Sequence, residues 1–374
     1  MVTYAYEQDW KLRRDIINQQ FRLGWEPAKF CTAVFDFFNY IDSVEVMPDL
    51  YHIMELMTLD TLGNVLFGFD FEAIRKPEGE HISTYFHAVK AALNVIYIAI
   101  PILEKLPSAS RAKGHMAVKE FRTLLGNLAI ARAEEIKKLP PGQESISSDL
   151  LTVLAKSWLD KRLELEEVVN EMIILIIAGH DTTASTLSCA IYFLARHPDI
   201  QAKVREEISG VFEGHTSTME APTSSQIKSL CYLEAVIKET MRFYPPTPLL
   251  LTHTTAEDTY IGNIPIPKDT LINMNMYAMH RSEEYWDSPN MFQPQRWISE
   301  DGNILNPSAW GPFADGSRIC IGKGFAMTEL KIDLAMIVRR YNLSFLKSDT
   351  ELQFEAEMIF KPKNLSILFT KIVD

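Results

Sequence analysis

The sequence has few cysteines and none of them are closely paired. Its 374 residues include four, Cys31, Cys189, Cys231 and Cys320, and no two form a CxxC motif. That spacing excludes both a disulfide scaffold and a zinc ribbon. We therefore predict that the protein lies in a reduced, intracellular setting.

The sequence also lacks an excess of positive charge. Its 37 lysines and arginines are outnumbered by 49 aspartates and glutamates, which gives a net charge of −12. Because no broad face could neutralise phosphates, we expect no nucleic-acid partner. No run of about 18 consecutive apolar residues is present, and no secretory signal follows Met1, so the chain as written is predicted to be soluble.

Helical periodicity dominates the first two thirds of the chain. The longest predicted helix runs from about Leu165 to Arg196 and ends at His197-Pro198, because the residue before a proline is disfavoured in a helix. Its middle, residues 172–178, is apolar on every face, which predicts a central helix buried on all sides.

The composition changes after this helix. Prolines become frequent, and short strand-like segments appear between the later helices. We expect helices at 200–212, 230–243 and 324–341, and strands at 258–261, 270–274, 343–346 and 365–370. The predicted fold class is therefore mainly α with small antiparallel β-sheets (α+β).

A cysteine-containing loop gives the strongest chemical signal. Residues 310–324 read WGPFADGSRICIGKG and contain Cys320. Gly316 and Gly322 permit tight turns that let peptide N–H groups point at the sulfur. A helix follows directly, and its positive end favours a thiolate, while Arg318 can bind a carboxylate. The pattern indicates a thiolate ligand for a metal cofactor that carries acid groups.

Polar residues in the middle of the central helix form the second signal. Ala178, Asp181, Thr182 and Ser185 follow helical spacing and are predicted to share one stripe. The small residues leave room for a flat ligand, and a hydroxyl beside a carboxylate can pass protons. An alternative remains open: Thr182 bonds back to the carbonyl one turn earlier, and Asp181 is solvated at a kink.

An acidic and basic pair gives the third signal. Glu239 and Arg242 lie one turn apart on a predicted helix that ends at Tyr244-Pro-Pro, and Arg296 follows in the segment Phe292–Trp297. Alone, such a pair is typical of an exposed surface.

These three motifs, in this order, resemble the cytochrome P450 family of haem-thiolate monooxygenases over essentially the whole chain, and this implies one P450 domain over residues 1–374. The resemblance implies haem b (iron protoporphyrin IX) with the Cys320 thiolate as axial ligand. It also implies that Phe313 packs near the sulfur, that Arg318 pairs with a haem propionate, and that Asp181 and Thr182 are the acid and alcohol that supply protons.

Other expectations follow from the same resemblance. Glu239, Arg242 and Arg296 would form a buried carboxylate–arginine triad. The segment from Trp10 to Arg14 resembles the WxxxR helix, whose two named residues hold a propionate. His253 stands where the family usually has an arginine that reaches the second propionate, and a histidine would give a weaker, pH-dependent bond.

The beginning of the chain departs from the family pattern. In the family, more than roughly 100 residues precede the WxxxR helix; they contain several strands of the main sheet and the substrate lid and, in microsomal members, a membrane anchor of about 20 residues. Trp10 lies close to Met1 here, so the expected P450 fold is incomplete at its N-terminus.

The resemblance implies a monooxygenase that inserts one atom of O2 into a hydrophobic small molecule. Electrons would come from NADPH through a flavoprotein, NADPH-cytochrome reductase. Lys11, Arg13 and Lys323 could meet this acidic partner or form a solvated basic rim. Substrate walls are expected at 174–178, 247–251 and 358–360. A full-length form would associate with the cytoplasmic face of the endoplasmic reticulum membrane. The alternative is a truncated fragment that binds haem without turnover.

Overall fold

The structure is a computed structural model of the 374-residue chain. It describes residues 7–44, 49–92, 108–140, 149–212, 220–250, 252–345, 351–356 and 358–372.

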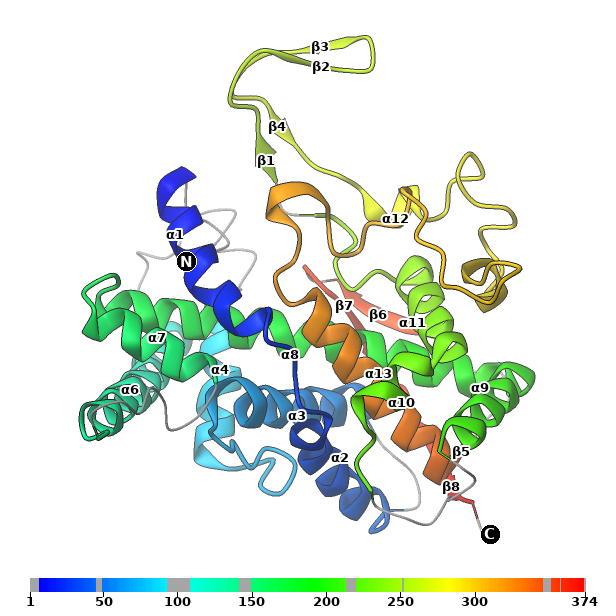
Figure 1. Cartoon of the computed structure of the whole chain (residues 1–374), viewed down its shortest axis with the longest axis horizontal. Helices are drawn as coiled ribbons and strands as arrows, with labels where there is room; N and C mark the ends of the chain where they lie inside the picture. The colour runs from blue at the N-terminus through cyan, green and yellow to red at the C-terminus, as the bar shows by residue number, and fades with distance from the viewer. Residues whose placement is uncertain are drawn as a thin grey trace.

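Helices packed around one long helix build most of the molecule (Figure 1). This helix, α8, spans Leu165–Arg196 and confirms the predicted bounds. A capping box formed by Glu164 and Glu167 satisfies its first backbone N–H groups, and Pro198 starts the next helix. The other α-helices within the described residues are α1 (Glu7–Phe21), α2 (Pro27–Ile41), α3 (Leu50–Leu62), α4 (Glu80–Ala92), α6 (Ala109–Lys137), α7 (Leu150–Leu159), α9 (Pro198–Val211), α10 (Ser224–Ser229), α11 (Cys231–Phe243), α12 (Met276–Met279) and α13 (Lys323–Arg340).

Short helical turns of other types link these helices. The π-helix η1 (Gly63–Phe67) continues α3, and the 3-10 turns η3 (Pro294–Trp297) and η4 (Gly316–Arg318) lie in the proline-rich region and the cysteine loop. A Cβ at Gly63 would clash with the Phe69 carbonyl oxygen, so the close approach of the chain here requires glycine.

The strands form small two-stranded antiparallel sheets, which confirms the predicted class. The described pairs are β1 (His253–Thr254) with β4 (Leu271–Ile272), β2 (Thr259–Ile261) with β3 (Ile264–Ile266), β5 (Tyr341–Phe345) with β8 (Ile367–Lys371), and β6 (Gln353–Ala356) with β7 (Phe360–Lys363). The hairpin of β6 and β7 was not among the predicted strands.

One face of α8 corrects the expectation that its middle is buried on all sides. Ala178 is exposed and Ile174 and Ile177 are only half-buried, whereas Met172 and Ile176 are buried in the core. By length and composition α8 could cross a membrane, but 67% of its most apolar stretch is buried inside the protein. It is therefore the core helix of this fold, with one uncovered apolar face.

Strands β1 to β4 form an arm that projects from the helical body (Figure 1). Tyr260, Ile264 and Leu271 are large apolar side chains on this arm, and each is at least 64% exposed. Such an exposed apolar surface on short strands favours association with other surfaces.

Candidate active site

Cys320 lies between the turn η4 and the start of α13. Its backbone N–H donates to the Phe313 carbonyl oxygen at 2.9 Å, which closes the cysteine loop. The backbone N–H groups of Gly322 and Lys323 donate to the sulfur of Cys320. This confirms that the loop directs peptide N–H groups at the sulfur, as expected where a helix begins.

The backbone N–H groups at the start of α13 favour a thiolate at Cys320, as predicted, but burial acts against them. The Cys320 side chain is exposed to solvent, yet many protein atoms surround it, and this desolvation raises the pKa of the thiol. The two backbone N–H groups and the charges of Arg14 and Lys323 act in the opposite direction, but the net pKa stays raised. Because metal ions deprotonate the thiols that bind them, this sulfur is suited to act as a thiolate when coordinated.

The two glycines of the loop have different roles. Gly316 has a φ of +72°, a left-handed conformation that favours glycine, so its predicted role in a tight turn is confirmed. Gly322 has a φ of −82°, which any residue can adopt, and its backbone N–H points at the Cys320 sulfur, as the close backbone approach predicted from the sequence requires. A Cβ at Gly322 would lie 3.8 Å from the Cys320 sulfur, an ordinary van der Waals contact, so the structure itself does not require glycine at this position.

Residues from both ends of the chain meet beside Cys320. The Arg318 guanidinium carbon lies 4.5 Å from the centre of the Trp10 ring on α1, a cation–π contact. Arg14, one turn further along α1, lies close enough for its charge to act on Cys320. Phe313 packs edge-on against Trp310, with the ring centres 6.0 Å apart. The structure thus brings Trp10, Arg14, Phe313 and Arg318 together at the cysteine loop.

His253 lies on the arm rather than among these residues. It is exposed on β1, where its backbone pairs with Ile272 of β4. Its predicted bond to a propionate stays a prediction.

Asp181 and Thr182 point toward different neighbours. The Thr182 hydroxyl donates to the Ala178 carbonyl oxygen at 2.9 Å, on the uncovered face of α8. Asp181 is 1% exposed, accepts a hydrogen bond from the Tyr51 hydroxyl and lies 3.1 Å from the Lys361 ammonium nitrogen. The hydrogen bond from Thr182 to the carbonyl one turn earlier confirms one part of the alternative interpretation. The other part, that Asp181 is solvated at a kink, is wrong because Asp181 is buried.

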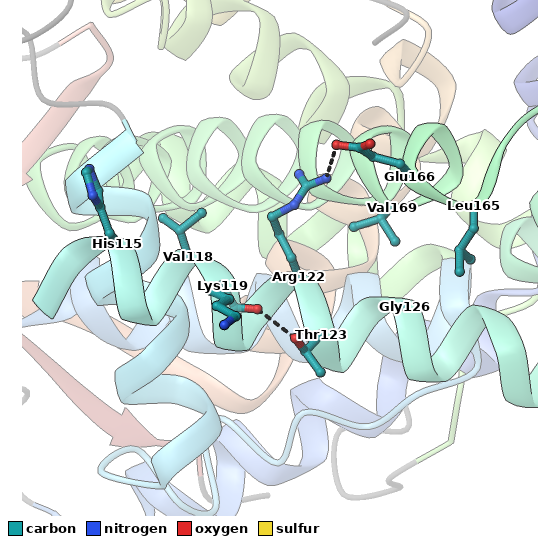
Figure 2. Close-up of a pocket in the computed structure, with 9 residues that line it drawn as sticks. All are labelled: His115, Val118, Lys119, Arg122, Thr123, Gly126, Leu165, Glu166 and Val169. Atoms are coloured by element: carbon teal, nitrogen blue, oxygen red, sulfur yellow. Dashed lines mark hydrogen bonds and ion pairs between the residues drawn. The ribbon is translucent and has the colours of Figure 1, made fainter. Parts of the chain in front are cut away.

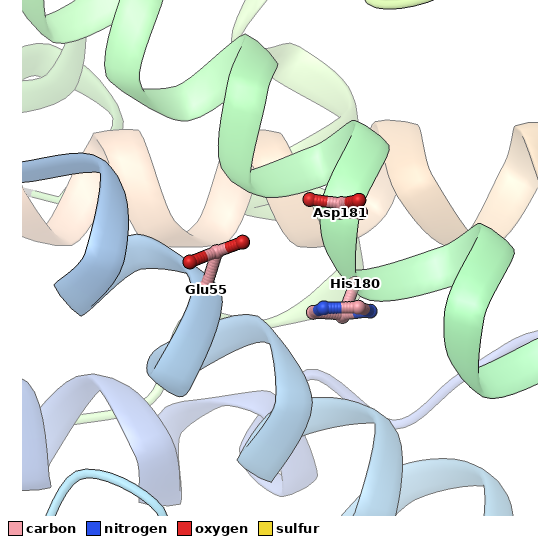
Figure 3. A group of neighbouring side chains, drawn as sticks. All are labelled: Glu55, His180 and Asp181. Carbon is pink, nitrogen blue, oxygen red and sulfur yellow. The ribbon is translucent and has the colours of Figure 1, made fainter. Parts of the chain in front are cut away.

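Asp181 belongs to a group of three side chains that could bind a metal ion. Ligand atoms of Glu55, His180 and Asp181 lie within 4.8 Å of one another, with Glu55 on α3 and the other two on α8 (Figure 3). The Lys361 ammonium lies 3.6 Å from Glu55 and 3.1 Å from Asp181, so it already supplies a cation to both carboxylates. Sequence reasoning missed Glu55 and Lys361, because only folding brings α3 and β7 to α8.

Glu239, Arg242 and Arg296 form a buried triad. Two nitrogens of Arg242 donate to Glu239 at 2.8 and 2.9 Å, and Arg296 Nε donates at 3.1 Å. Trp297 Nε1 also donates to Glu239, at 2.9 Å. Glu239 and Arg242 are fully buried, so the alternative of an exposed surface pair is wrong.

The proposed basic surface is smaller than expected. Lys11 and Lys323 are exposed, but Arg13 is buried and hydrogen-bonded to three carboxylates, those of Asp9, Glu167 and Glu171. Arg13 therefore joins α1 to the beginning of α8 and offers no charge to a partner.

A separate hollow of about 640 Å³ lies between α6 and the beginning of α8 (Figure 2). Arg122 reaches across it to Glu166 at 3.4 Å and to Asn170 at 2.7 Å. None of its lining residues belongs to the site predicted from the sequence.

Comparison of the sequence with known proteins identifies the family to which the chain belongs. The family described as Cytochrome P450 matches residues 1–369. The chain belongs to the cytochrome P450 family. It is similar to cytochrome P450 3A6 of Oryctolagus cuniculus, with 25% identity over 98% of this chain and 75% of that protein. Cytochrome P450 4d1 of Drosophila simulans is 31% identical over 84% of this chain and 64% of that protein. Cytochrome P450 4V2 of Homo sapiens is 35% identical over 54% of this chain and 38% of that protein.

Family membership makes this P450 a relative of haem monooxygenases, and its own residues fit a haem. A thiol with two backbone N–H groups at a helix start suits an axial ligand. Arg318 and Arg14 supply the cations that propionates need. The aligned regions cover about two thirds to three quarters of the first two relatives, so the activity of this chain is a matter for proposal.

Proposed function

We propose that this cytochrome P450 is a monooxygenase that inserts one oxygen atom from O2 into a hydrophobic organic substrate. The observation that carries the proposal is the loop in which two backbone N–H groups point at the Cys320 sulfur, at the start of α13. Haem b held there would supply the activation of O2, and a thiolate ligand favours cleavage of the O–O bond.

The residues around the cofactor have distinct roles in this proposal. Cys320 binds the iron, with Phe313 beside the loop and with Gly316 and Gly322 shaping it. Arg318, stacked on Trp10, binds one propionate together with Arg14. His253, on β1, would bind the second propionate.

The uncovered face of α8 forms the opposite wall of the site. Ala178 leaves room for a flat ligand, and the half-buried Ile174 and Ile177 give an apolar surface that excludes water and favours a hydrophobic substrate. Thr182 presents its hydroxyl on this face, and Asp181 supplies protons from behind it. The other predicted substrate walls are residues 247–251 and 358–360, and Leu251 lies outside the described residues.

The electrons come from NADPH through a flavoprotein reductase in this proposal. The exposed Lys11 and Lys323 offer positive charge to an acidic partner. We place the enzyme at the cytoplasmic face of the endoplasmic reticulum membrane by analogy with the family.

The reduced, CO-bound absorption spectrum tests the ligand. The haem-loaded protein is expected to show the spectrum of thiolate ligation, and Cys320→Ser is expected to lose it. A Cys189→Ser control should keep it, since Cys189 is buried in the core. An unchanged spectrum in Cys320→Ser would refute the ligand assignment.

Alkylation of thiols and consumption of NADPH separate the remaining outcomes. Without haem the exposed Cys320 should react with an alkylating reagent, and with haem it should be protected. Consumption of NADPH in the presence of reductase and substrate supports a monooxygenase. Retained haem with no consumption supports haem binding without turnover.

A further inference from the structure

The ammonium group of Lys238 on α11 is buried without a counter-charge. The residue is 2% exposed, and no carboxylate in the described part of the chain forms an ion pair with its nitrogen. Glu234, one turn earlier on α11, pairs with Lys331 at 3.0 Å instead. A buried cation without a counter-charge costs stability, and an apolar side chain of similar volume would avoid this cost. A role other than stability is therefore indicated for this lysine.

Neutral groups from the segment that leads into the cysteine loop surround the Lys238 ammonium. It donates to the Leu305 carbonyl oxygen at 2.8 Å and to the side-chain oxygen of Asn306. Its nitrogen lies 4.8 Å from the centre of the Trp310 ring and 5.4 Å from that of Trp297. Desolvation lowers the pKa of Lys238 to about 8, so the ammonium is still charged at neutral pH. An indole ring attracts a cation most strongly where water is excluded.

The start of the cysteine loop is attached to α11 through two adjacent residues, Trp310 and Gly311. The Trp310 Nε1–H donates to the Lys238 carbonyl oxygen at 3.3 Å, so the ring is held by both the backbone and the side chain of Lys238. The Gly311 backbone N–H donates to His280 Nε2 at 3.3 Å. Arg242 of α11 in turn donates to the His280 carbonyl oxygen at 2.8 Å.

The contacts continue from Trp310 to Cys320. The Trp310 ring packs edge-on against Phe313, with 6.0 Å between the ring centres. The Phe313 carbonyl oxygen accepts the hydrogen bond from the Cys320 backbone N–H at 2.9 Å. Because closely packed side chains transmit a displacement to their neighbours, a shift of Trp310 moves Phe313 and then the backbone that carries the sulfur.

We propose that Lys238 is a positioning residue for Cys320: its ammonium group fixes the Trp310 ring, and Trp310 sets the orientation of the cysteine loop and its sulfur. The consequence for the iron rests on the proposed function, whereas the attachment of the loop does not need haem. Glu239, the next residue of α11, holds the segment at η3. Neighbouring residues of one helix thus fix two different segments.

Hydrogen exchange of the full chain, with and without haem, tests the attachment of the loop. Lys238→Met nearly keeps the length of the side chain but removes the cation. The Cys320 backbone N–H should then exchange about tenfold faster, a factor that matches the loss of a desolvated cation–π contact. The amides of residues 187–191 in the buried part of α8 should keep their wild-type rates.

Two matched variants control this experiment. Lys238→Arg keeps a cation and should restore slow exchange of the Cys320 N–H at least in part. Lys228→Met, at an exposed position of α10, should exchange like the wild type. Unchanged exchange at Cys320 in Lys238→Met would overturn the proposal, and so would an equal increase in the loop and in α8, because a general loss of stability affects both.

The reduced, CO-bound spectrum of the haem-loaded protein gives a second readout. In Lys238→Met the spectrum of thiolate ligation should be lost about tenfold faster than in the wild type, at temperatures below the unfolding transition. Lys238→Arg should lose it more slowly than Lys238→Met, and Lys228→Met should match the wild type. Equal rates in Lys238→Met and the wild type would contradict the role of Lys238 toward the iron.

Trp310→Leu tests the route from Lys238 to the loop. It removes the ring on which Lys238 acts, so it should itself speed the exchange of the Cys320 N–H. This result can be obtained even if Lys238→Met does not fold. Adding Lys238→Met to Trp310→Leu should cause a much smaller further change than in the wild-type background, because the two residues act as a pair. Fully additive effects would show that Lys238 does not act through Trp310.

These measurements also separate the two proposals. If the wild-type protein shows no thiolate spectrum, the proposed function fails, while hydrogen exchange still tests the attachment of the loop. If the spectrum is present and neither readout responds to Lys238→Met, the positioning role alone fails.

Discussion

Glu239 is a fully buried carboxylate that accepts hydrogen bonds from three side chains, those of Arg242, Arg296 and Trp297. It also accepts one from the Gln293 backbone N–H at 2.8 Å. This one residue therefore connects α11 to the segment around η3. The family resemblance predicted the two arginines, but the tryptophan and the backbone contact follow only from the fold.

Glu239→Gln should destabilise the protein strongly. The amide removes the negative charge and leaves the guanidinium of Arg242 buried without its counter-charge, which costs about 3–5 kcal/mol. Urea unfolding monitored by circular dichroism should show this loss in the free energy of unfolding. Glu134→Gln on α6, where Glu134 pairs with Lys137 at the surface, should leave the unfolding midpoint unchanged. Equal midpoints for both variants would contradict the buried role of the triad.

At the scale of elements, α13 carries two buried acids one turn apart. Glu329 and Asp333 are both fully buried, and neither oxygen of Asp333 has a hydrogen-bond partner within the described residues. Burial raises the pKa of Asp333 well above its ordinary value. Burial and the neighbouring Asp333 also raise the pKa of Glu329, while the Thr183 hydroxyl acts in the opposite direction.

These acids should make stability fall as pH rises. Above the ordinary pKa of about 4 the unfolded chain releases these protons while the folded protein keeps them, so the free energy of unfolding decreases up to the raised pKa. Asp333→Asn should reduce this slope by up to about 1.4 kcal/mol per pH unit. Urea unfolding between about pH 5 and pH 8, where many proteins are most stable, measures the slope. The exposed control Glu300→Gln should keep the wild-type slope, and an unchanged slope in Asp333→Asn would refute the assignment.

Elements with clear local sequence patterns were predicted better than elements that form only by pairing with a distant segment. The bounds of α8 were predicted correctly because a proline follows its last turn and its apolar residues recur regularly. The strands β6 and β7 were missed because each has only four residues and becomes a strand by pairing with the other.

For the whole molecule, the arm of β1 to β4 is the most conspicuous exposed apolar feature among the described residues (Figure 1). Tyr260 and Ile264 lie on paired strands and are 71% and 64% exposed. Side chains so exposed contribute little to folding, yet they offer an apolar surface for self-association.

Replacing these two side chains should improve solubility without changing stability. The double variant Tyr260→Ser, Ile264→Thr should scatter less light at high protein concentration, and its melting temperature should match that of the wild type. As a control, Lys268→Ser at an exposed polar position of the arm should not reduce the scattering. A large fall in melting temperature would show that the arm packs against the body.

The sequence alone indicated the family and the helical class and predicted the cysteine ligand, because these depend on residues close together in the chain. The loop around Cys320 and the spacing within α8 are local patterns that carry their chemistry wherever they fold. The tertiary structure alone decided that Asp181 is held by Tyr51 and Lys361, that Arg13 is buried, and that one face of α8 is uncovered. Those features join segments far apart in the sequence, and charge and burial at such contacts are set by packing rather than by neighbours in the chain.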